Sequence, residues 1–185
     1  MKRRIFLTAA AMMTFPLAWA SSRKTPTAPQ REGPFYPVKD IPLSNNLVIS
    51  KKAILGDVMS LEGKITNRAG DVISGARVEI WQCDAQGIYD HPRQPGYTRF
   101  DPAFTGFGAT NTDSSGRYQF TTMLPYPYPG RPPHIHVKIW IGNEEKLTTQ
   151  LYLAEQNPYV PKNLKLSPRK VGNDEWLADF DFVVV

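Results

Sequence analysis

Short apolar runs that alternate with polar residues recur along the chain and predict β-strands. Between residues 76 and 83, Val78 and Ile80 alternate with Arg77 and Glu79, the period of two of a half-buried strand. Similar runs predict further strands at 58–65, 117–120, 134–140, 146–153 and 176–185. No run shows convincing helical periodicity with caps, so the pattern indicates an all-β protein.

Turn-forming residues separate these runs and limit the length of any helix. Residues 67–71 and 113–116 hold the Asn, Asp, Ser and Gly residues that favour tight turns. The 185 residues include 17 prolines and 13 glycines, which interrupt helices too often for long ones to form. A chain of this length with several short strands is typical of a single β-sandwich domain with long connecting loops, or of a barrel.

The first 20 residues have the composition of an export signal. Lys2, Arg3 and Arg4 precede an apolar stretch over 5–17, and residues 18–20 offer a small-x-small cleavage site. The paired arginines favour a twin-arginine signal, with a general secretory signal as the alternative. The apolar stretch is too short to span a bilayer well, so we expect an exported, periplasmic or secreted protein without stable membrane insertion.

The rest of the chain divides into a leader and a folded domain. Residues 21–30 are polar and contain proline, which predicts a flexible leader before a domain over 31–185. Removing the three basic signal residues from the total of 22 leaves 19 against 17 acidic ones. So small a positive charge, scattered along the chain, predicts no nucleic-acid partner. The single cysteine, Cys83, lies in an apolar run and is expected to be a buried, inert thiol.

Two of the three histidines, His134 and His136, are separated by one residue in a predicted strand. Side chains at i and i+2 of a strand project from the same face, so both imidazoles can reach one metal ion. Ile135 and its alternate neighbours then face the core. A pair of this kind is a weak signal by itself, because two surface histidines share a strand by chance.

Tyrosines near this pair narrow the choice of metal. Tyr126, Tyr128 and Arg131 lie in a proline-rich turn just before it, and Tyr89 follows the strand that contains Trp81. The chain has no spare cysteine for a thiolate site and no dense acidic loop of the calcium type. Phenolate oxygens together with imidazoles suit a hard ion such as ferric iron, Fe(3+), which also favours the ionised form of a phenol.

With these residues in view, the chain resembles the intradiol ring-cleavage dioxygenases, especially the protocatechuate 3,4-dioxygenase branch. The resembling segments follow the order of the family and span nearly the whole predicted domain, at 32–37, 78–91, 101–137 and 147–153. The resemblance implies a transthyretin-like (prealbumin-like) sandwich that binds one ferric ion. It also implies cleavage of a catechol-type substrate by O2 between the two hydroxylated carbons, giving a muconate-type dicarboxylate.

Carried over to this chain, the resemblance implies iron ligation by two tyrosines and two histidines, namely Tyr89, Tyr128, His134 and His136. Tyr128 is also implied to leave the iron when substrate binds, and Tyr126 is its rival for the second tyrosine position. Arg131 matches an arginine before the histidine pair, and Gln150 matches a glutamine in the Thr-Gln motif. Alternatively, Arg131 is a surface charge in a turn and Gln150 a polar residue of an edge strand.

One departure and two competing interpretations accompany the resemblance. The loop at 129–133 is shorter than in the best-known protocatechuate enzymes. The sequence indicates no long helical N-terminal segment, which separates the chain from the catechol 1,2-dioxygenases that dimerise through one. The substrate stays open, as does the choice between a homo-oligomer and pairing with a related chain. A non-catalytic transthyretin-like or carboxypeptidase-regulatory-like binding module is the alternative from another class. A cupin-type oxygenase is disfavoured because no third ligand follows at cupin spacing.

Overall fold

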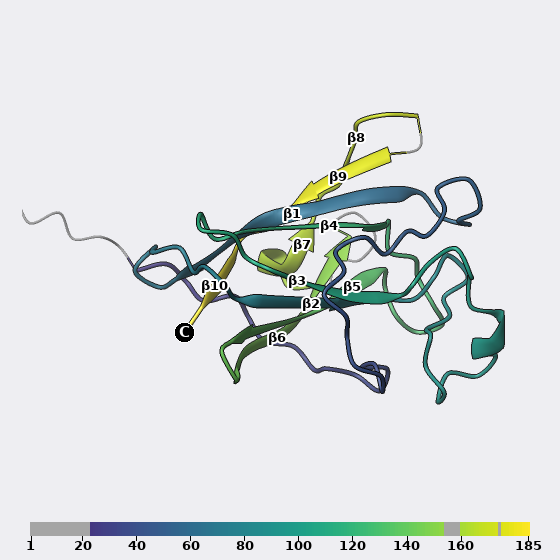
Figure 1. Ribbon diagram of the computed structural model, residues 1–185, viewed down its shortest axis with the longest axis horizontal. Helices are drawn as coiled ribbons and strands as arrows, with labels where there is room; N and C mark the ends of the chain where they lie inside the picture. Colours follow the sequence, from purple (N-terminus) through teal and green to yellow (C-terminus); the bar gives the residue numbers. More distant parts are fainter. Residues whose placement is uncertain (1–22, 154–159, 174) are drawn as a thin grey trace, which may run out of the picture.

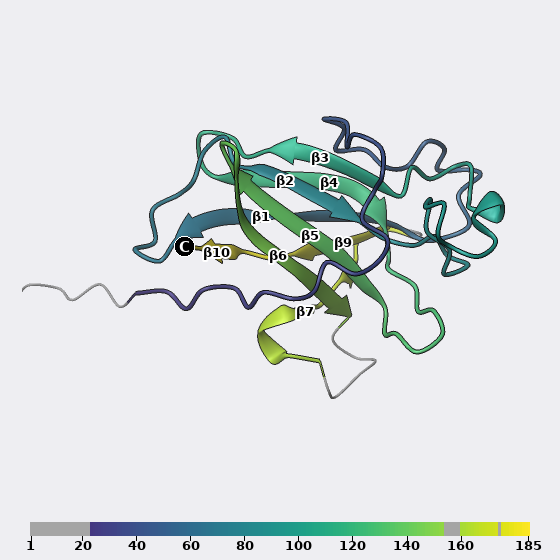
Figure 2. The same ribbon diagram turned by 90° about the horizontal axis from the view of Figure 1, so that it is seen from below.

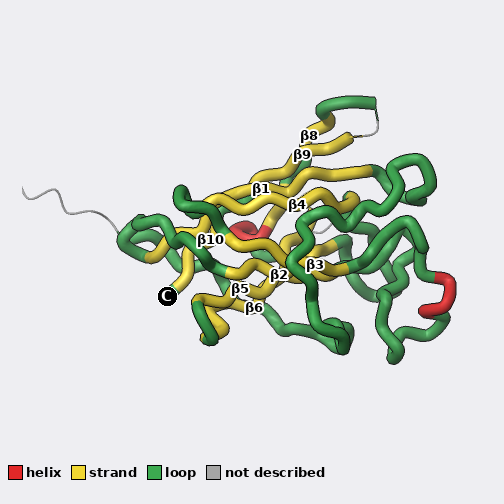
Figure 3. The backbone as a smooth tube through the Cα atoms, in the orientation of Figure 1, coloured by secondary structure: helices red, strands yellow, loops and turns green. Residues whose placement is uncertain are grey.

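The computed structural model describes residues 23–153, 160–173 and 175–185, so the predicted export signal at 1–20 lies outside the described residues. These residues form ten strands and two short 3-10 helices, η1 (Tyr97–Arg99) and η2 (Lys162–Leu164). Figure 3 shows a backbone of strands and long loops with only short helical turns, and the all-β prediction is confirmed. In the described part of the chain, no helix is long and apolar enough to cross a membrane.

The strands form two five-stranded sheets (Figure 1). The first has the order β3 (Phe107–Asn111), β2 (Arg77–Trp81), β5 (His134–Ile141), β6 (Glu144–Leu153) and β7 (Lys165–Leu166). In the second sheet, β1 (Val58–Asn67) pairs with β4 (Arg117–Met123), β9 (Glu175–Asp179) and β10 (Phe182–Val184), and β8 (Arg169–Lys170) pairs with β9. The transthyretin-like sandwich that the resemblance implies stays a prediction.

The main hydrophobic core contains side chains from both sheets. Strand β5 contributes Ile135, Val137 and Ile139, each 0% exposed, and β1 contributes Met59 to the same cluster. The predicted placement of Ile135 and its alternate neighbours in the core is therefore confirmed. Burying a side chain of this size stabilises a fold by roughly 1.5–3 kcal/mol. The two histidines of β5 occupy the alternate positions and project from its other, outer face.

Strand β2 differs from the prediction because both of its faces are buried. Glu79, on the face expected to be polar and exposed, is only 5% exposed. Its carboxylate accepts hydrogen bonds from the Tyr36 hydroxyl at 2.8 Å and from Trp140 Nε1 at 3.1 Å. Tyr36 of the N-terminal segment thus packs on the outer face of the first sheet, and Glu79 lies buried beneath it.

The single terminal strand predicted at 176–185 is two strands, β9 and β10. Between them, the Phe180 N–H donates to the Glu62 carbonyl, and the Phe180 carbonyl accepts from the Tyr118 hydroxyl at 2.7 Å. Gly63 permits this close approach, because a Cβ at this position would lie 1.9 Å from the Phe180 carbonyl oxygen. The break therefore depends on contacts with β1 and β4, which the local pattern does not contain.

The described part of the predicted flexible leader is hydrogen-bonded to strand residues at positions 24, 27 and 30. The Thr27 N–H donates to the Val183 carbonyl and the Gln30 N–H to the Thr148 carbonyl, both at 2.9 Å. Figure 2 shows this N-terminal segment running beside the sheets and then crossing β6 and β5. Its described part is thus built into the domain, and it leads residues 31–36 across the histidine-bearing face.

Candidate metal centre

The two histidines of β5 bring their ring nitrogens together on the outer face of the sheet. Their Nε2 atoms lie 3.1 Å apart, and both side chains are at most 2% exposed. His134 Nδ1 lies 2.6 Å from the Pro132 carbonyl, so Nδ1 carries the hydrogen and Nε2 keeps its lone pair. Burial lowers the pKa of His134 to about 4 and holds the pKa of His136 well below its usual value. Both rings are therefore neutral near pH 7, as metal ligands must be.

Tyr89 approaches the same point from the turn that follows β2. Its hydroxyl lies 3.4 Å from His134 Nε2, and the side chain is 2% exposed. Asp84 organises the turn, because its carboxylate accepts the N–H groups of two following residues and its own N–H donates to the Ile88 carbonyl. Gly87 has φ +75°, and a Cβ there would lie 2.9 Å from the Tyr128 Cβ. The turn therefore needs glycine to let the two tyrosine segments meet.

Tyr128 completes the group of four. Its ring centroid lies 5.7 Å from that of Tyr89 and 5.5 Å from that of His134. A tight turn holds it, in which the Arg131 N–H donates to the Tyr128 carbonyl at 2.9 Å. Tyr126, its rival, packs against the main core, whereas Tyr128 packs with the cluster that contains Tyr89. The structure thus brings together Tyr128, and not Tyr126, with the two histidines.

The donor set is suited to a hard cation. Metal–nitrogen and metal–oxygen bonds are roughly 2.0–2.2 Å long, as at zinc sites, so two ligands at right angles lie roughly 3 Å apart. The 3.1 Å separation of the two histidine Nε2 atoms matches this spacing. Among the described residues, no group of three or more His, Cys, Asp or Glu side chains could hold a metal ion. Tyr89 and Tyr128 lie beside the two imidazoles and could supply oxygen ligands to a metal bound at this point.

Burial alone does not ionise the tyrosines. It raises the pKa of Tyr89 far above its usual value, and it raises the pKa of Tyr128 despite the opposing charge of Arg131. Near neutral pH both would be phenols without a stronger positive charge beside them. A trivalent cation supplies such a charge, because it favours the ionised form of an adjacent acid.

Arg131 is held beside this group by Gln150 of β6. The guanidinium donates to Gln150 Oε1 at 2.5 Å, and the Tyr152 hydroxyl donates to the same oxygen at 2.9 Å. Gln150 Nε2 donates to the Arg31 carbonyl at 2.7 Å, and the side chain is 3% exposed. Gln150 is therefore a buried residue whose side chain makes three hydrogen bonds and fixes the direction of Arg131. Neither residue is the free surface group of the competing interpretation.

The strand register explains why these side chains meet. Trp81 and Gln150 lie directly opposite His136 on the two neighbouring strands, and Tyr152 lies opposite His134. The Trp81 ring consequently stacks on His136 with centroids 4.8 Å apart and an interplanar angle of 11°. Trp81 and Tyr152 were not predicted as site residues. The i, i+2 relation of Tyr152 to Gln150 is the signal that could have revealed it.

Residues 31–36 cover the centre from the N-terminal side. Phe35 stacks on Tyr89 with centroids 4.8 Å apart, and Tyr36 meets Trp81 edge-on at 5.0 Å. Gly33, with φ +81°, comes so close to His136 that a Cβ would lie 3.3 Å from its Cε1 atom. The sequence indicates residues 32–37 only as part of the family resemblance and does not predict that they contact the site.

The chain matches the Dioxygenase family model over residues 31–183. It is 33% identical over 135 residues to the protocatechuate 3,4-dioxygenase beta chain of Burkholderia cepacia, covering 64% of this chain and 56% of that protein. It is 34% identical over 143 residues to catechol 1,2-dioxygenase of Candida albicans, covering 66% and 46%. The chain thus spans about half the length of these curated relatives.

Among solved structures, similarity extends over a complete domain. The dioxygenase domain of a dioxygenase carbohydrate-binding protein fusion from Streptomyces sp. SirexAA-E has a TM-score of 0.71 and 31% sequence identity to this chain, covering 86% of this chain and 97% of that one. Together with the family match over 31–183, this favours the dioxygenase interpretation over a transthyretin-like binding module. The chain belongs to the intradiol ring-cleavage dioxygenase family.

Proposed function

We propose that this protein is a ferric-iron dioxygenase that opens catechol-type rings with O2 between the two hydroxylated carbons. The product would be a muconate-type dicarboxylate. Tyr89, Tyr128, His134 and His136 would hold the iron. The observation that carries the proposal is the convergence of neutral, buried donors, with His134 Nε2 3.1 Å from His136 Nε2 and 3.4 Å from the Tyr89 hydroxyl.

The two tyrosines are suited to different tasks. Bound ferric iron would supply Lewis acidity, drawing electron density from a chelated catechol toward reaction with O2. Tyr89 is 2% exposed and lies under Phe35, so it can serve as the permanent phenolate ligand. Tyr128 is only partly buried and lies in a short turn at the surface. It can therefore move aside and take up a proton from the substrate hydroxyl, as a general base.

Arg131 would stabilise the negative charge that develops on the substrate ring. Gln150 aims its guanidinium, so no reorganisation is needed at the moment of reaction. One preorganised donor of this kind is worth roughly 10²–10³ in kcat. Both residues act on the substrate side of the centre and not as metal ligands.

We further propose that the protein acts outside the cytoplasm, exported through the twin-arginine signal expected at 1–20. A route that exports folded proteins would let iron be acquired before transport. N-terminal sequencing of the protein recovered from the periplasm or medium tests this, and a start near residue 21 is expected. Recovery of the uncleaved chain in the cytoplasm alone would contradict the proposal.

The visible absorption spectrum of the iron-loaded protein, before and after adding catechol without oxygen, tests the proposed activity. A tyrosinate-to-iron charge-transfer band that shifts with catechol is expected. His136→Ala should lose this band, whereas His91→Ala removes another buried histidine outside the four proposed ligands and should keep it. A protein that stays colourless after loading with ferric iron would count against the proposal.

A further inference from the structure

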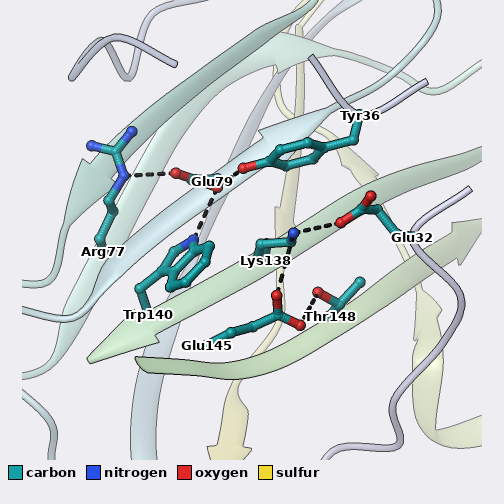
Figure 4. Close-up of polar contacts among 8 residues, drawn as sticks. All are labelled: Glu32, Tyr36, Arg77, Glu79, Lys138, Trp140, Glu145 and Thr148. Atoms are coloured by element: carbon teal, nitrogen blue, oxygen red, sulfur yellow. Dashed lines mark hydrogen bonds and ion pairs between the residues drawn. The ribbon is translucent and has the colours of Figure 1, made fainter. Parts of the chain in front are cut away.

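A buried lysine lies in line with the two histidines of the centre. Lys138 is two residues beyond His136 on β5, projects from the same outer face and is 4% exposed. A lysine is rarely buried to this degree unless its charge is paired. Its ammonium lies 2.5 Å from a Glu32 oxygen and 3.3 Å from a Glu145 oxygen (Figure 4). It also lies 4.0 Å from the centroid of the Tyr36 ring.

The two carboxylates around Lys138 come from different parts of the fold. Glu145 belongs to β6, the strand that pairs with β5, and it also accepts a hydrogen bond from Thr148 at 2.8 Å. Glu32 is 106 residues from Lys138 in sequence and belongs to the segment 31–36. The pair with Glu32 therefore fastens this segment to the sheet, whereas the pair with Glu145 joins two strands that are already paired.

Tyr36 fastens the other end of the segment. Its hydroxyl donates to Glu79 at 2.8 Å, and the same carboxylate accepts from Trp140 and pairs with Arg77 (Figure 4). Glu79 lies directly opposite Lys138 in the register of β2 and β5. The Lys138–Glu32 ion pair and the Tyr36–Glu79 hydrogen bond therefore lie side by side on the outer face of the sheet.

Residues between Glu32 and Tyr36 contact the proposed metal centre. Gly33 lies against His136, and Phe35 stacks on Tyr89. Arg31, next to Glu32, accepts the hydrogen bond from Gln150 that helps to aim Arg131. A shift of the segment would therefore move both the wall beside the ligands and the support of Arg131.

We propose that Lys138 and Glu32 are positioning residues whose ion pair holds segment 31–36 over the metal centre and so fixes the wall against which the catechol ring binds. This inference rests on the proposed function. Neither residue touches the reacting atoms, because the pair acts through Gly33, Phe35 and Arg31. Loss of the pair should weaken substrate binding more than it slows the reaction of bound substrate.

Glu32→Gln and Glu145→Gln form a matched pair of variants. Each removes one carboxylate charge from Lys138, and the two side chains are 44% and 43% exposed. Glu32→Gln should raise the KM and the anaerobic Kd for catechol about two- to fivefold, the range expected for a partly exposed ion pair. Its kcat should change less, and Glu145→Gln should leave all three values close to those of the unchanged protein.

Hydrogen exchange provides a readout that does not depend on iron or turnover. Amides of residues 31–37 should exchange faster in Glu32→Gln than in Glu145→Gln, with the exchange of β1 unchanged in both. Equal effects of the two variants on exchange and Kd, or unchanged exchange in Glu32→Gln, would overturn the positioning role. If the unchanged protein shows no iron band, the proposed function fails, while the exchange comparison still tests whether the ion pair holds the segment.

Discussion

The substitution Gln150→Leu tests how far Arg131 depends on a buried partner. The amide makes three hydrogen bonds, with Arg131, Tyr152 and the Arg31 carbonyl, and leucine makes none of them. Two neutral hydrogen bonds contribute about 1 kcal/mol each, and one to a charged group contributes about 1.5–3 kcal/mol. Arg131 is only partly buried and regains water, so the lower end applies to it. We therefore expect a loss of about 3.5 kcal/mol in the free energy of unfolding.

A loss of this size leaves the domain folded, because native domains are stable by about 5–15 kcal/mol. In a chain of this length it should lower Tm by roughly 7–14 °C, measured by thermal unfolding. The Arg131 guanidinium would also no longer be held in position. We therefore expect kcat/KM to fall to about one tenth or less, with iron content unchanged.

Gln82→Leu is the matched control. Gln82 is 1% exposed and bonds the Met123 carbonyl and Thr122, so its loss also destabilises the fold. Neither bond involves Arg131 or Gln150. The kcat/KM of Gln82→Leu should therefore stay close to that of the unchanged protein. If Gln150→Leu lowers Tm but leaves kcat/KM unchanged, Gln150 is a structural residue and the positioning argument is refuted.

Three further outcomes are expected. Tyr128→Phe should keep the iron but turn over about a hundredfold more slowly, because the substrate proton loses its acceptor; unchanged turnover would refute that role. Burial raises the pKa of the Cys83 thiol to about 12, so the folded protein should resist a thiol reagent at pH 8 and react once unfolded in urea. Rapid labelling of the folded protein at pH 8 would contradict the burial of this thiol. The raised pKa contributes stability that is fully present below about pH 9 and is lost as the pH rises toward 12. Gly63→Ala should destabilise the fold by about 2 kcal/mol or more, since its Cβ would meet the Phe180 carbonyl, and an unchanged urea midpoint would argue against this packing.

The sequence by itself determined the features that depend on near neighbours. The period of two at 134–140 placed His134 and His136 on one face and Ile135 on the other, as the structure has them. This succeeds because the alternation of side chains is a property of any extended strand. The segments at 32–37, 78–91, 101–137 and 147–153 likewise indicated the family, since they follow one another along the chain over most of residues 31–183.

Only the tertiary structure decided what lies beside the histidines. The register of β2, β5 and β6 places Trp81 and Gln150 opposite His136, and no local pattern specifies that pairing. The packing of Tyr128, and not Tyr126, with the cluster that contains Tyr89 agrees with the position that the resemblance already implied for the second tyrosine.

The burial of Lys138 and Glu79 also could not be predicted from the local sequence pattern. Both occupy polar positions of an alternating strand, which locally indicate an exposed face. Segment 31–36 covers both residues. Glu32, the residue of this segment that pairs with Lys138, is 106 residues away from it in the sequence. Pairings over such distances are fixed by the packing of the whole domain, because each is stable only when the surfaces it joins are already formed.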